Sequence, residues 1–483
     1  MPARRRLIVV GGVAAGMSAA SRARRMDPSL EILVFERTGF VSYGSCGLPY
    51  YLAGLVGRSE DLVVYSPAFF KERRDIDVFV GHEVTALDPS SRRVQVRGLA
   101  DGEVREVAYD VLVLATGASA VRPPVPGVGR PGVFVLRTLE DGIAMRRHVD
   151  VLTGPDRTDG GRPRAVLVGA GPIGLEVAEA LTARGLSVSL VEMAGQVLPG
   201  YHPDLAAHVE AELRRHGVDV HVNEALAAVE GAGDGGAATA VRTASGRTLP
   251  ADLVLLATGI RPNVELARQA GLRLGSTGAV AVDHRLLTSD PHIYAAGDGV
   301  ETWHRVLRRP AWIPLGTTSN KMGRIAGENA AGGDATFRGV VGTAALRIFD
   351  VEVGRTGLTE AEAAAEGWEP VTAYVRHGSR AHYYPGPGPV HLWLVGDRRS
   401  GRLLGAQAVG PAGAVAKRVD VLAVAVTAGM DVDEVAELDL SYAPPLAPVW
   451  DPILMAARAW GKAAGREQEP GSARAAGETA RGA

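Results

Sequence analysis

Short apolar runs that end in glycine recur along the chain, and the first of them opens a strand–helix–strand pattern. Residues 7–10 are apolar and run into Gly11 and Gly12, which is typical of a buried parallel strand entering a tight turn. Residues 13–26 carry small residues on one face and arginines toward the end, which predicts a helix. Residues 31–36 predict a second strand. The pattern is that of a βαβ unit.

The same pattern returns in the middle of the chain. Residues 164–168 predict a strand, the segment from 169 to about 184 a helix, and residues 187–192 the next strand. Two nearly identical runs, 110–117 and 252–259, each predict a strand that ends in a glycine turn, at equivalent places in the two halves. The chain is therefore expected to contain duplicated nucleotide-binding domains.

The last third of the chain has a different pattern. Strands predicted at 344–349 and 391–395 alternate with helices such as 417–429, so an α+β domain is expected over residues 333–460. Residues 461–483 are rich in Ala, Gly, Glu and Arg and lack periodic apolar positions, which predicts a disordered tail.

Composition narrows the functional classes. Hydrophobic residues make up 46% of the 483 residues and charged residues 22%, which is ordinary for a soluble enzyme. A net charge of -2 gives no support for nucleic-acid binding, and no apolar run is long enough to span a membrane. The single cysteine rules out an intramolecular disulfide framework, so we expect a reducing cytoplasm.

The glycine turns explain why nucleotides should bind. Glycine lets a pyrophosphate approach the first turn of the helix, and an acidic residue closing the second strand accepts hydrogen bonds from ribose hydroxyls. The second unit has the full G-x-G-x-x-G at 169–174, with Glu192 as its acid. The first has the outer glycines, Val13 in the middle position, and Glu36 as its acid. A carboxylate repels a 2′-phosphate, so Glu192 favours NADH over NADPH.

Cys46 is the candidate for chemistry. It lies among small residues in the stretch 41–51, ten residues beyond the first βαβ unit. A free cysteine is often only a small buried hydrophobe. Its position beside a nucleotide-binding unit favours a redox role, and we expect a helix N-terminus or a positive group to lower its pKa.

From residue 6 to about 458 the chain resembles the flavin-dependent pyridine nucleotide–disulfide oxidoreductases. Within them it is most similar to the single-cysteine branch of coenzyme A-disulfide reductases. Four segments carry the resemblance: Val-Val-Gly-Gly-Val-Ala-Ala-Gly at 9–16, Ser-Cys-Gly-Leu-Pro-Tyr-Tyr at 45–51, Tyr-Tyr-Pro-Gly at 383–386 and Tyr-Ala-Pro-Pro at 442–445. The segments around the cysteine and the tyrosines are the specific ones.

The resemblance implies an α/β fold with two Rossmann-like dinucleotide-binding domains and a C-terminal α+β dimerisation domain. It implies an FAD-binding domain formed by 1–118 and 262–332, an NAD(P)H-binding domain over 119–261, and a homodimer. FAD would be held by Gly11, Val13, Ala14, Gly16, Glu36, Arg37, Val84, Ala115, Thr116, Gly117 and Asp298. NAD(P)H would be held by Gly169, Gly171, Pro172, Ile173, Gly174, Glu192 and Gly259. From the residues alone, a helix cap is the favoured interpretation of Asp298.

The resemblance also implies that Cys46 alternates between a thiolate and a mixed disulfide with coenzyme A, beside Tyr383 and Tyr442 from the partner subunit. Taken singly, each tyrosine is by default a residue that packs at an interface. The positions implied to hold coenzyme A are Ser18, Arg22, Arg25, Ser42, Ser45 and Arg74. Ser45 stands where many relatives have asparagine and Arg22 where some have glutamine, and both positions bear on substrate preference. No metal ion enters this scheme.

Three alternatives stay open. Reduction of coenzyme A persulfide or polysulfide needs the same cysteine and pocket. An NADH oxidase of the same fold is disfavoured, because oxygen-reducing relatives place a histidine in the first glycine loop and residues 11–17 have none. A flavin redox sensor without turnover belongs to another class.

Overall fold

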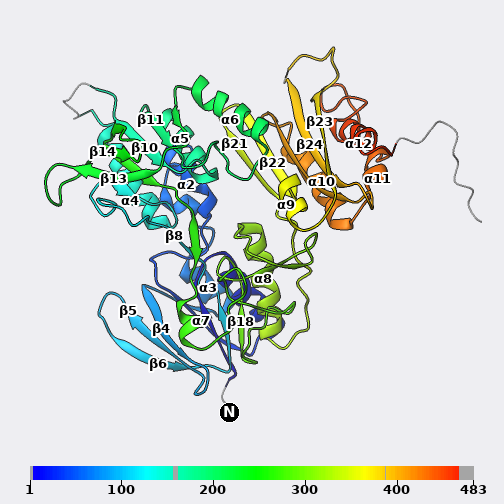
Figure 1. Ribbon diagram of the computed structural model, residues 1–483. Coiled ribbons are helices and arrows are strands. Elements are labelled where there is room, and N and C mark those ends of the chain that lie inside the picture. Colours follow the sequence, from blue (N-terminus) through cyan, green and yellow to red (C-terminus); the bar gives the residue numbers. More distant parts are fainter. Residues whose placement is uncertain (1–3, 156–160, 387, 467–483) are drawn as a thin grey trace, which may run out of the picture. The chain divides into compact units, whose positions relative to one another are not determined.

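The computed structural model describes residues 4–155, 161–386 and 388–466. The chain divides into two compact units (Figure 1). The first comprises residues 1–342 and 346–350, and the second residues 343–345 and 351–483. Among the described residues, no helix has the length and apolar character needed to cross a membrane.

The first unit contains a parallel sheet that holds the first glycine loop. Its strands, in spatial order, are β18 (Ile293–Ala295), β7 (Val111–Leu114), β1 (Arg6–Val10), β2 (Glu31–Glu36) and β3 (Asp77–Val80). The associated helices are α1 (Ala14–Met26), α2 (Leu48–Ala53), α3 (Pro67–Arg74), α7 (Glu265–Gln269) and α8 (Gly316–Ala330), with the short 3-10 helices η1 (Ser45–Gly47) and η2 (Ser59–Leu62). The four residues of β7 are buried, as a doubly covered parallel strand requires.

Helices α1 and α8 pack unusually close beside this sheet. A Cβ added to Gly323 or Gly327 of α8 would lie 2.2 or 2.1 Å from the backbone oxygens of Ala15 and Ala19 of α1. Since a side chain cannot occupy that space, glycine at these positions lets the two helices touch through their backbones. The contact fixes α1, which follows the first glycine loop.

A second parallel sheet of the first unit holds the second glycine loop. Its order is β12 (Asp219–His221), β11 (Ser187–Val191), β10 (Arg164–Val168), β16 (Leu253–Leu256) and β9 (Val133–Phe134), and its helices are α4 (Leu139–Leu152), α5 (Pro172–Ala183) and α6 (Pro203–Arg215). Both predicted βαβ units are therefore confirmed. The separate sheets support the predicted division into FAD- and NAD(P)H-binding domains, whose exact boundaries stay a prediction.

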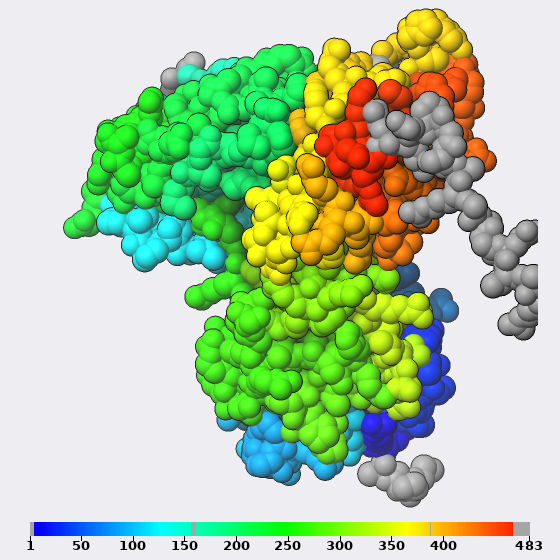
Figure 2. Space-filling model, turned by 45° about the vertical axis from the view of Figure 1, so that its right-hand side comes forward, coloured from blue at the N-terminus to red at the C-terminus, as the bar shows by residue number. Residues whose placement is uncertain are grey.

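Smaller antiparallel elements complete the first unit. They are the sheet of β4 (His82–Asp88), β5 (Arg93–Gly98) and β6 (Val104–Ala108), the sheet of β13 (Leu226–Gly231), β14 (Ala238–Thr243) and β15 (Thr248–Pro250), the pair β8 (Ala118–Ala120) and β17 (Ile260–Pro262), and the hairpin β19 (Thr302–His304) and β20 (Arg309–Ala311). The β4–β6 sheet lies at the edge of the first unit (Figure 1). Light-blue atoms of this part of the chain reach the surface at the bottom of Figure 2.

The second unit is built on an antiparallel sheet with the order β22 (Val351–Gly357), β25 (Leu403–Pro411), β24 (Pro389–Asp397) and β23 (Pro370–Gly378). Its helices are α9 (Glu360–Ala365), α10 (Ala416–Ala428), α11 (Val432–Ala436) and α12 (Pro452–Ala463). Trp460 of α12 is fully buried and its indole N–H donates to the carbonyl of Val371, 2.8 Å away. This α+β unit confirms the predicted class of the C-terminal domain.

Two boundaries differ from the expectations. Residues 333–342 belong with the first unit, where Phe337 packs into the core of the first sheet. Helix α12 extends to Ala463, three residues into the segment 461–483 that was expected to be disordered. Residues 467–483 lie outside the described part of the chain. Strand β21 (Ala344–Ile348) spans the change from one unit to the other.

Candidate functional site

The Cys46 loop is tied to the first glycine loop. Cys46 lies in η1, directly before α2, and its side chain is exposed. The backbone N–H of Ser42 donates to the carbonyl of Gly12 at 2.9 Å, and Ser42 adopts a left-handed φ of 50°. Beyond the cysteine, a Cβ on Gly47 would meet the side chain of Leu62 at 2.4 Å. The structure therefore places Cys46 beside the nucleotide loop, as the sequence predicts.

The expectation of a lowered Cys46 pKa is wrong for the chain as it stands. Part of the Cys46 side chain is open to solvent, but burial against the surrounding protein raises the pKa of the thiol. The negative charge of Glu176 raises this pKa further. Arg137 opposes this effect and Asp298 adds to it. The following helix, α2, has six residues and does not dominate.

The first glycine loop has the geometry that a dinucleotide requires. Gly11 has a φ of 106°, and a Cβ there would lie 2.2 Å from the carbonyl oxygen of Ala115. A Cβ on Gly16 would lie 1.8 Å from the carbonyl oxygen of Gly11. The Gly12 N–H donates to Oε2 of Glu36 at 2.7 Å. The glycines thus let the loop pass close to the start of α1, which fits the pyrophosphate of FAD, although Val13 stands where the second loop has Gly171.

The second glycine loop repeats this geometry closely. Gly169 has a φ of 107°, with its Cβ position 2.3 Å from the carbonyl oxygen of Ala257. A Cβ on Gly174 would lie 2.0 Å from the carbonyl oxygen of Gly169. Around Gly171, by contrast, a Cβ would meet no atom within 4 Å. This open space above the middle glycine fits the pyrophosphate of a second dinucleotide.

The two acids that close the second strands are held alike. Glu36 is 6% exposed and Glu192 is 9% exposed, so neither merely ends a strand in solvent. Oε2 of Glu192 accepts from the Ala170 N–H at 2.7 Å, as Oε2 of Glu36 does from Gly12. Oε1 of each accepts from a backbone N–H two residues on, at 2.8 Å. Oε2 of each carboxylate accepts one hydrogen bond and keeps a further lone pair for a ribose hydroxyl, whereas Oε1 of Glu36 also accepts from the Thr38 hydroxyl at 2.8 Å.

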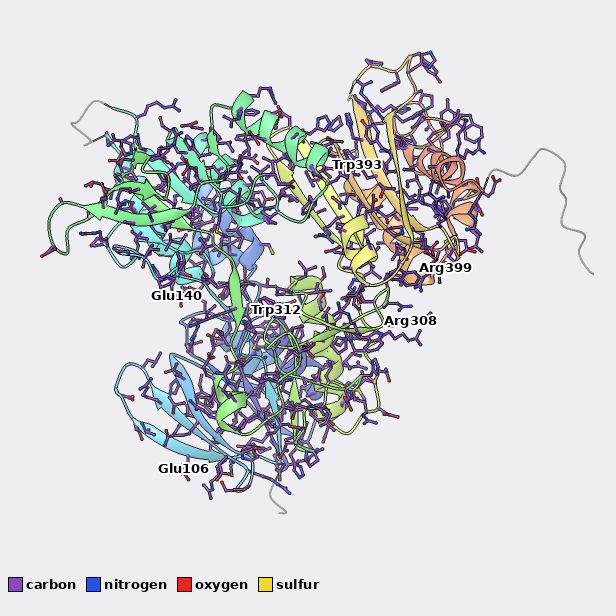
Figure 3. The ribbon with its side chains drawn as sticks, viewed as in Figure 1. Glu106, Glu140, Arg308, Trp312, Trp393 and Arg399 are labelled. Carbon is purple, nitrogen blue, oxygen red and sulfur yellow. The ribbon has the colours of Figure 1, made fainter. Side chains whose placement is uncertain are left out.

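Asp298 sits at the centre of a polar network. Its Oδ2 accepts from Nη2 of Arg137 at 2.6 Å and its Oδ1 accepts from the Ser319 hydroxyl at 2.6 Å. Its carbonyl accepts from the indole N–H of Trp312 at 2.7 Å. Trp312 is labelled in Figure 3. The sequence did not identify Arg137, Ser319 or Trp312, because no motif marks them.

The remaining predicted nucleotide positions lie at the strand ends. Ala115, Thr116 and Gly117 follow β7, and Gly259 follows β16, with φ of 66° at Gly117 and 97° at Gly259. The Thr116 hydroxyl donates to the carbonyl of Asn263 at 2.8 Å, which ties this turn to β17. The others are placed as follows: Val13 and Ala14 at the start of α1, Pro172 and Ile173 at the start of α5, Arg37 exposed after β2, and Val84 buried in β4.

The positions implied to hold coenzyme A fall on three elements of the first unit. Ser18, Arg22 and Arg25 lie on α1, Ser42 and Ser45 in the Cys46 loop, and Arg74 at the end of α3. Nη2 of Arg22 is 2.6 Å from Oε2 of Glu328, so its charge is already paired. Arg74 donates to the Ser21 hydroxyl and lies 5.3 Å from the centre of the Tyr65 ring.

In the second unit the structure brings Tyr383 and Tyr442 together. Their hydroxyl oxygens are 3.0 Å apart, and both side chains are exposed. The hydrogen bond between the two hydroxyls raises the pKa of Tyr442.

Among the described residues, one cluster of side chains has the residue types that bind metal ions. Candidate ligand atoms of Glu212, His216 and Asp350 lie within 4.8 Å of one another. Arg215 donates to the carboxylates of Glu212 and Asp350 at 2.7 and 2.6 Å. The guanidinium therefore supplies the positive charge, and the group is an ion-pair network.

Comparison with known proteins identifies the family. Residues 5–315 match the model of pyridine nucleotide-disulphide oxidoreductases, and residues 343–452 match the dimerisation domain of that family. A CoA-dependent NAD(P)H sulfur oxidoreductase of Pyrococcus abyssi is 40% identical over 94% of this chain and 97% of its own. A coenzyme A disulfide reductase of Staphylococcus haemolyticus is 33% identical over 91% of this chain and 96% of its own.

A solved NAD-dependent persulfide reductase of A. fulgidus is 40% identical, with a TM-score of 0.90 over 95% of this chain and 84% of that one. The fold, the two glycine loops and these matches agree. The chain belongs to the pyridine nucleotide-disulphide oxidoreductases and is an FAD- and NAD(P)H-dependent oxidoreductase with the dimerisation domain of that family.

Proposed function

We propose that this flavoenzyme uses NADH to reduce the disulfide of coenzyme A through Cys46. The observation that carries the proposal is the tether between the loop of the single cysteine and the first glycine loop, the Ser42 N–H to Gly12 carbonyl bond of 2.9 Å. A cysteine held there lies beside the FAD site, and with no second cysteine in the chain its disulfide partner must come from the substrate.

The redox step balances with one external disulfide. The Cys46 thiolate attacks one sulfur of coenzyme A disulfide, forming a mixed disulfide and releasing one coenzyme A thiolate. FAD, when bound, supplies the passage of two electrons from NADH to that mixed disulfide. Cleavage then regenerates the Cys46 thiolate and releases the second coenzyme A, so NADH and one proton yield NAD⁺ and two thiols.

The coenzyme A positions are proposed from the same region. Ser18 on α1 and Ser42 and Ser45 in the loop would orient the thiol arm, while Arg25 and Arg74 would meet phosphates. Arg25 is exposed and makes no ion pair within the described residues, which suits this role. Arg22 would first have to leave Glu328.

A second acceptor is favoured by a specific observation. The relatives named for sulfur or persulfide reduction are 40% identical to this chain, whereas the coenzyme A disulfide reductase is 33% identical. Coenzyme A persulfide or polysulfide would use the same cysteine and the same pocket, so it stands as the alternative substrate.

We also propose a cytoplasmic homodimer whose two active sites are each completed by the partner. Support comes from the dimerisation-domain match and from the exposed pair Tyr383 and Tyr442 in that domain. These tyrosines would donate hydrogen bonds to the sulfur leaving Cys46.

The test is an NADH oxidation assay with FAD-loaded protein and four acceptors: coenzyme A disulfide, coenzyme A persulfide, polysulfide and oxygen. Repeated turnover with the disulfide is expected. Faster turnover with persulfide would select the alternative. Turnover with oxygen alone, or with none of the four, would contradict the proposal.

A further inference from the structure

A hollow in the first unit lies outside both glycine loops and outside the Cys46 loop. Its volume is about 480 Å³, and three of the residues that line it are arginines: Arg305, Arg308 and Arg338. The other lining residues are His284, Trp303, Thr336 and Phe337. None of these described lining residues is acidic. The hollow shares no residue with the positions assigned above to FAD, NADH or coenzyme A, so the proposed function leaves it unexplained.

Backbone hydrogen bonds join the three chain segments that form the hollow. The Val340 N–H donates to the carbonyl of Trp303 at 2.9 Å, and the Arg305 N–H donates to the carbonyl of Val340 at 2.9 Å. The Phe337 N–H donates to the carbonyl of His284 at 2.7 Å. Phe337 is 7% exposed and packs into the core of the first sheet. The fold therefore fixes the walls of the hollow before any ligand arrives.

The turn between β19 and β20 fixes the backbone at Arg308. The Leu307 N–H donates to Nδ1 of His304 at 3.2 Å, and the Arg308 N–H donates to the carbonyl of His304 at 2.8 Å. His304 is buried, so the turn is anchored from within the protein. Arg308, which is labelled in Figure 3, has a left-handed φ of 54°, a conformation that few residues other than glycine adopt. The turn thus holds an exposed arginine in one place.

Arg308 and Arg338 have no acidic partner within the described residues. Both are exposed, and neither side chain makes a hydrogen bond or an ion pair there. The neighbouring Arg285, by contrast, is paired with Asp334. Like charges around one hollow repel one another, and a cleft lined by one sign of charge concentrates ions of the other sign. An anion in the hollow would remove this repulsion.

The donors around the hollow suit phosphate oxygens. A guanidinium group presents several N–H donors in a planar fork that can bind a phosphate through two parallel hydrogen bonds. The hydroxyl of Thr336 can donate to a further oxygen. Since these groups donate and carry positive charge, the hollow favours an anion with several acceptor oxygens.

Trp303 offers an aromatic surface beside these charges. The ring of His284 meets the indole edge to face, with 5.1 Å between ring centres. A Cβ on Gly339 would lie 2.9 Å from Cδ1 of the indole, so glycine, with a φ of 85°, lets the chain pass against the ring. The indole is fixed by these contacts and is still partly exposed. The planar base of a nucleotide can stack on such a ring.

We propose that this hollow binds a phosphorylated nucleotide, with the phosphates on the arginines and the base on Trp303. The volume of the hollow lies within the range of about 300–1,000 Å³ that is typical of small-molecule sites. Inorganic phosphate shares the anionic chemistry but has no base, so it would use the arginines alone. Cys46 takes no part in this site, so the inference stands or falls separately from the proposed function.

Photolabelling with 8-azido-ATP locates the site. The FAD-loaded protein is irradiated with the probe, and mass spectrometry identifies the labelled peptides. Label is expected within residues 303–308 or 336–338, and unlabelled ATP should prevent it. Inorganic phosphate should need a concentration at least about tenfold higher, because it lacks the stacking of the base. Label confined to the glycine loops, or label in the hollow that ATP does not prevent, would overturn the proposal.

Arginine variants test the phosphate contacts. Arg308→Gln and Arg338→Gln should each raise about tenfold the ATP concentration that halves labelling, because each removes a charged hydrogen-bond donor. Arg309→Gln is the matched control, since Arg309 is the next residue, is exposed and does not line the hollow. Its competition curve should match that of wild type. Equal effects of the three variants would show a general attraction of surface charge for ATP and would overturn the proposal.

Variants of Trp303 test the contact with the base. Trp303→Leu should weaken competition by ATP and leave competition by inorganic phosphate unchanged, whereas Trp303→Phe keeps a ring and should retain both. If Trp303→Leu fails to fold, the wild type alone still decides. Equal potency of ATP and inorganic phosphate in the wild type would show that the hollow does not bind the base, which would overturn the assignment to a nucleotide.

Discussion

The hydroxyl oxygens of Tyr383 and Tyr442 lie 3.0 Å apart, although 59 positions separate the two residues in the chain. Tyr383 is 64% exposed and Tyr442 is 47% exposed. Exposed phenols held to each other, rather than packed against a core, present hydroxyl groups outward from the second unit. Such hydroxyls can donate hydrogen bonds to a group on another chain.

Complementation tests that interpretation. Chains with Cys46→Ser and chains with Tyr383→Phe plus Tyr442→Phe should each be impaired as homodimers, the latter by about a hundredfold. Random mixing gives heterodimers with one intact site, so activity should recover to about a quarter of wild type in a two-fold symmetric dimer. Sedimentation gives the oligomeric state, and a fully active monomer would contradict shared sites.

Cys46→Ser should keep bound FAD and lose disulfide reduction to background. The side chain is exposed and the residues of the glycine loop do not depend on it, so the fold should persist. Flavin absorbance after gel filtration measures the first outcome and NADH oxidation the second. Reduction near the wild-type rate would make Cys46 a structural residue.

The glycines of the second loop separate folding from cofactor binding. Gly174→Ala places a Cβ 2.0 Å from the carbonyl oxygen of Gly169, so the helix must shift, at a cost of about 1–3 kcal/mol or more. Gly171→Ala meets no atom within 4 Å and has a φ of -76°, which alanine adopts freely. Its stability should change by less than about 0.5 kcal/mol.

What Gly171→Ala should change is the binding of the nicotinamide cofactor. Its Cβ would project into the space proposed for the pyrophosphate, so the KM for NADH should rise about tenfold while the thermal midpoint stays constant. Equal destabilisation by the two alanine variants, or an unchanged KM, would show that the pyrophosphate lies elsewhere.

The acidic network at the end of α6 predicts a pH effect on stability. Burial opposes ionisation of Glu212, but hydrogen bonds from Arg215 and from the Asp350 N–H outweigh it and hold the pKa of Glu212 below its usual value. A lowered pKa contributes stability above the unfolded value of about 4.3, and this is lost as pH falls through the folded value.

Thermal midpoints between about pH 7 and pH 3 check this. The wild type should lose stability more steeply below about pH 4.5 than Glu212→Gln, which keeps an acceptor for the Asp350 N–H but has no charge to lose. Parallel curves would mean that Glu212 has the same pKa in the folded and unfolded chains.

Local patterns predicted the strands and helices of the two βαβ units and the acids that end their second strands, because strand, glycine turn and acid follow one another closely in sequence. Val13, which breaks the first motif, simply precedes α1. Arg137 and Asp298 form an ion pair although 161 positions separate them in the chain. Glu176, whose charge raises the pKa of Cys46, likewise belongs to no motif that includes the cysteine. The positions of such residues depend on long-range packing, so the sequence around each residue does not predict its contacts. The sign of the Cys46 pKa shift was missed for the same reason.

The last prediction concerns the choice between NADH and NADPH. Glu192 is 9% exposed, and its oxygens accept from the N–H groups of Ala170 and Ala194 at 2.7 and 2.8 Å. These two hydrogen bonds hold the carboxylate in a fixed orientation at the second glycine loop. It can therefore accept hydrogen bonds from ribose hydroxyls and would repel a 2′-phosphate. NADH should therefore be used with kcat/KM at least about tenfold higher than NADPH, a difference of about 1.4 kcal/mol. Glu192→Ala should narrow that ratio, because it removes the repelling charge. Met193→Ala is the control, since that side chain is 76% exposed and should leave the ratio unchanged. Higher efficiency with NADPH in the wild type would show that Glu192 does not face the ribose.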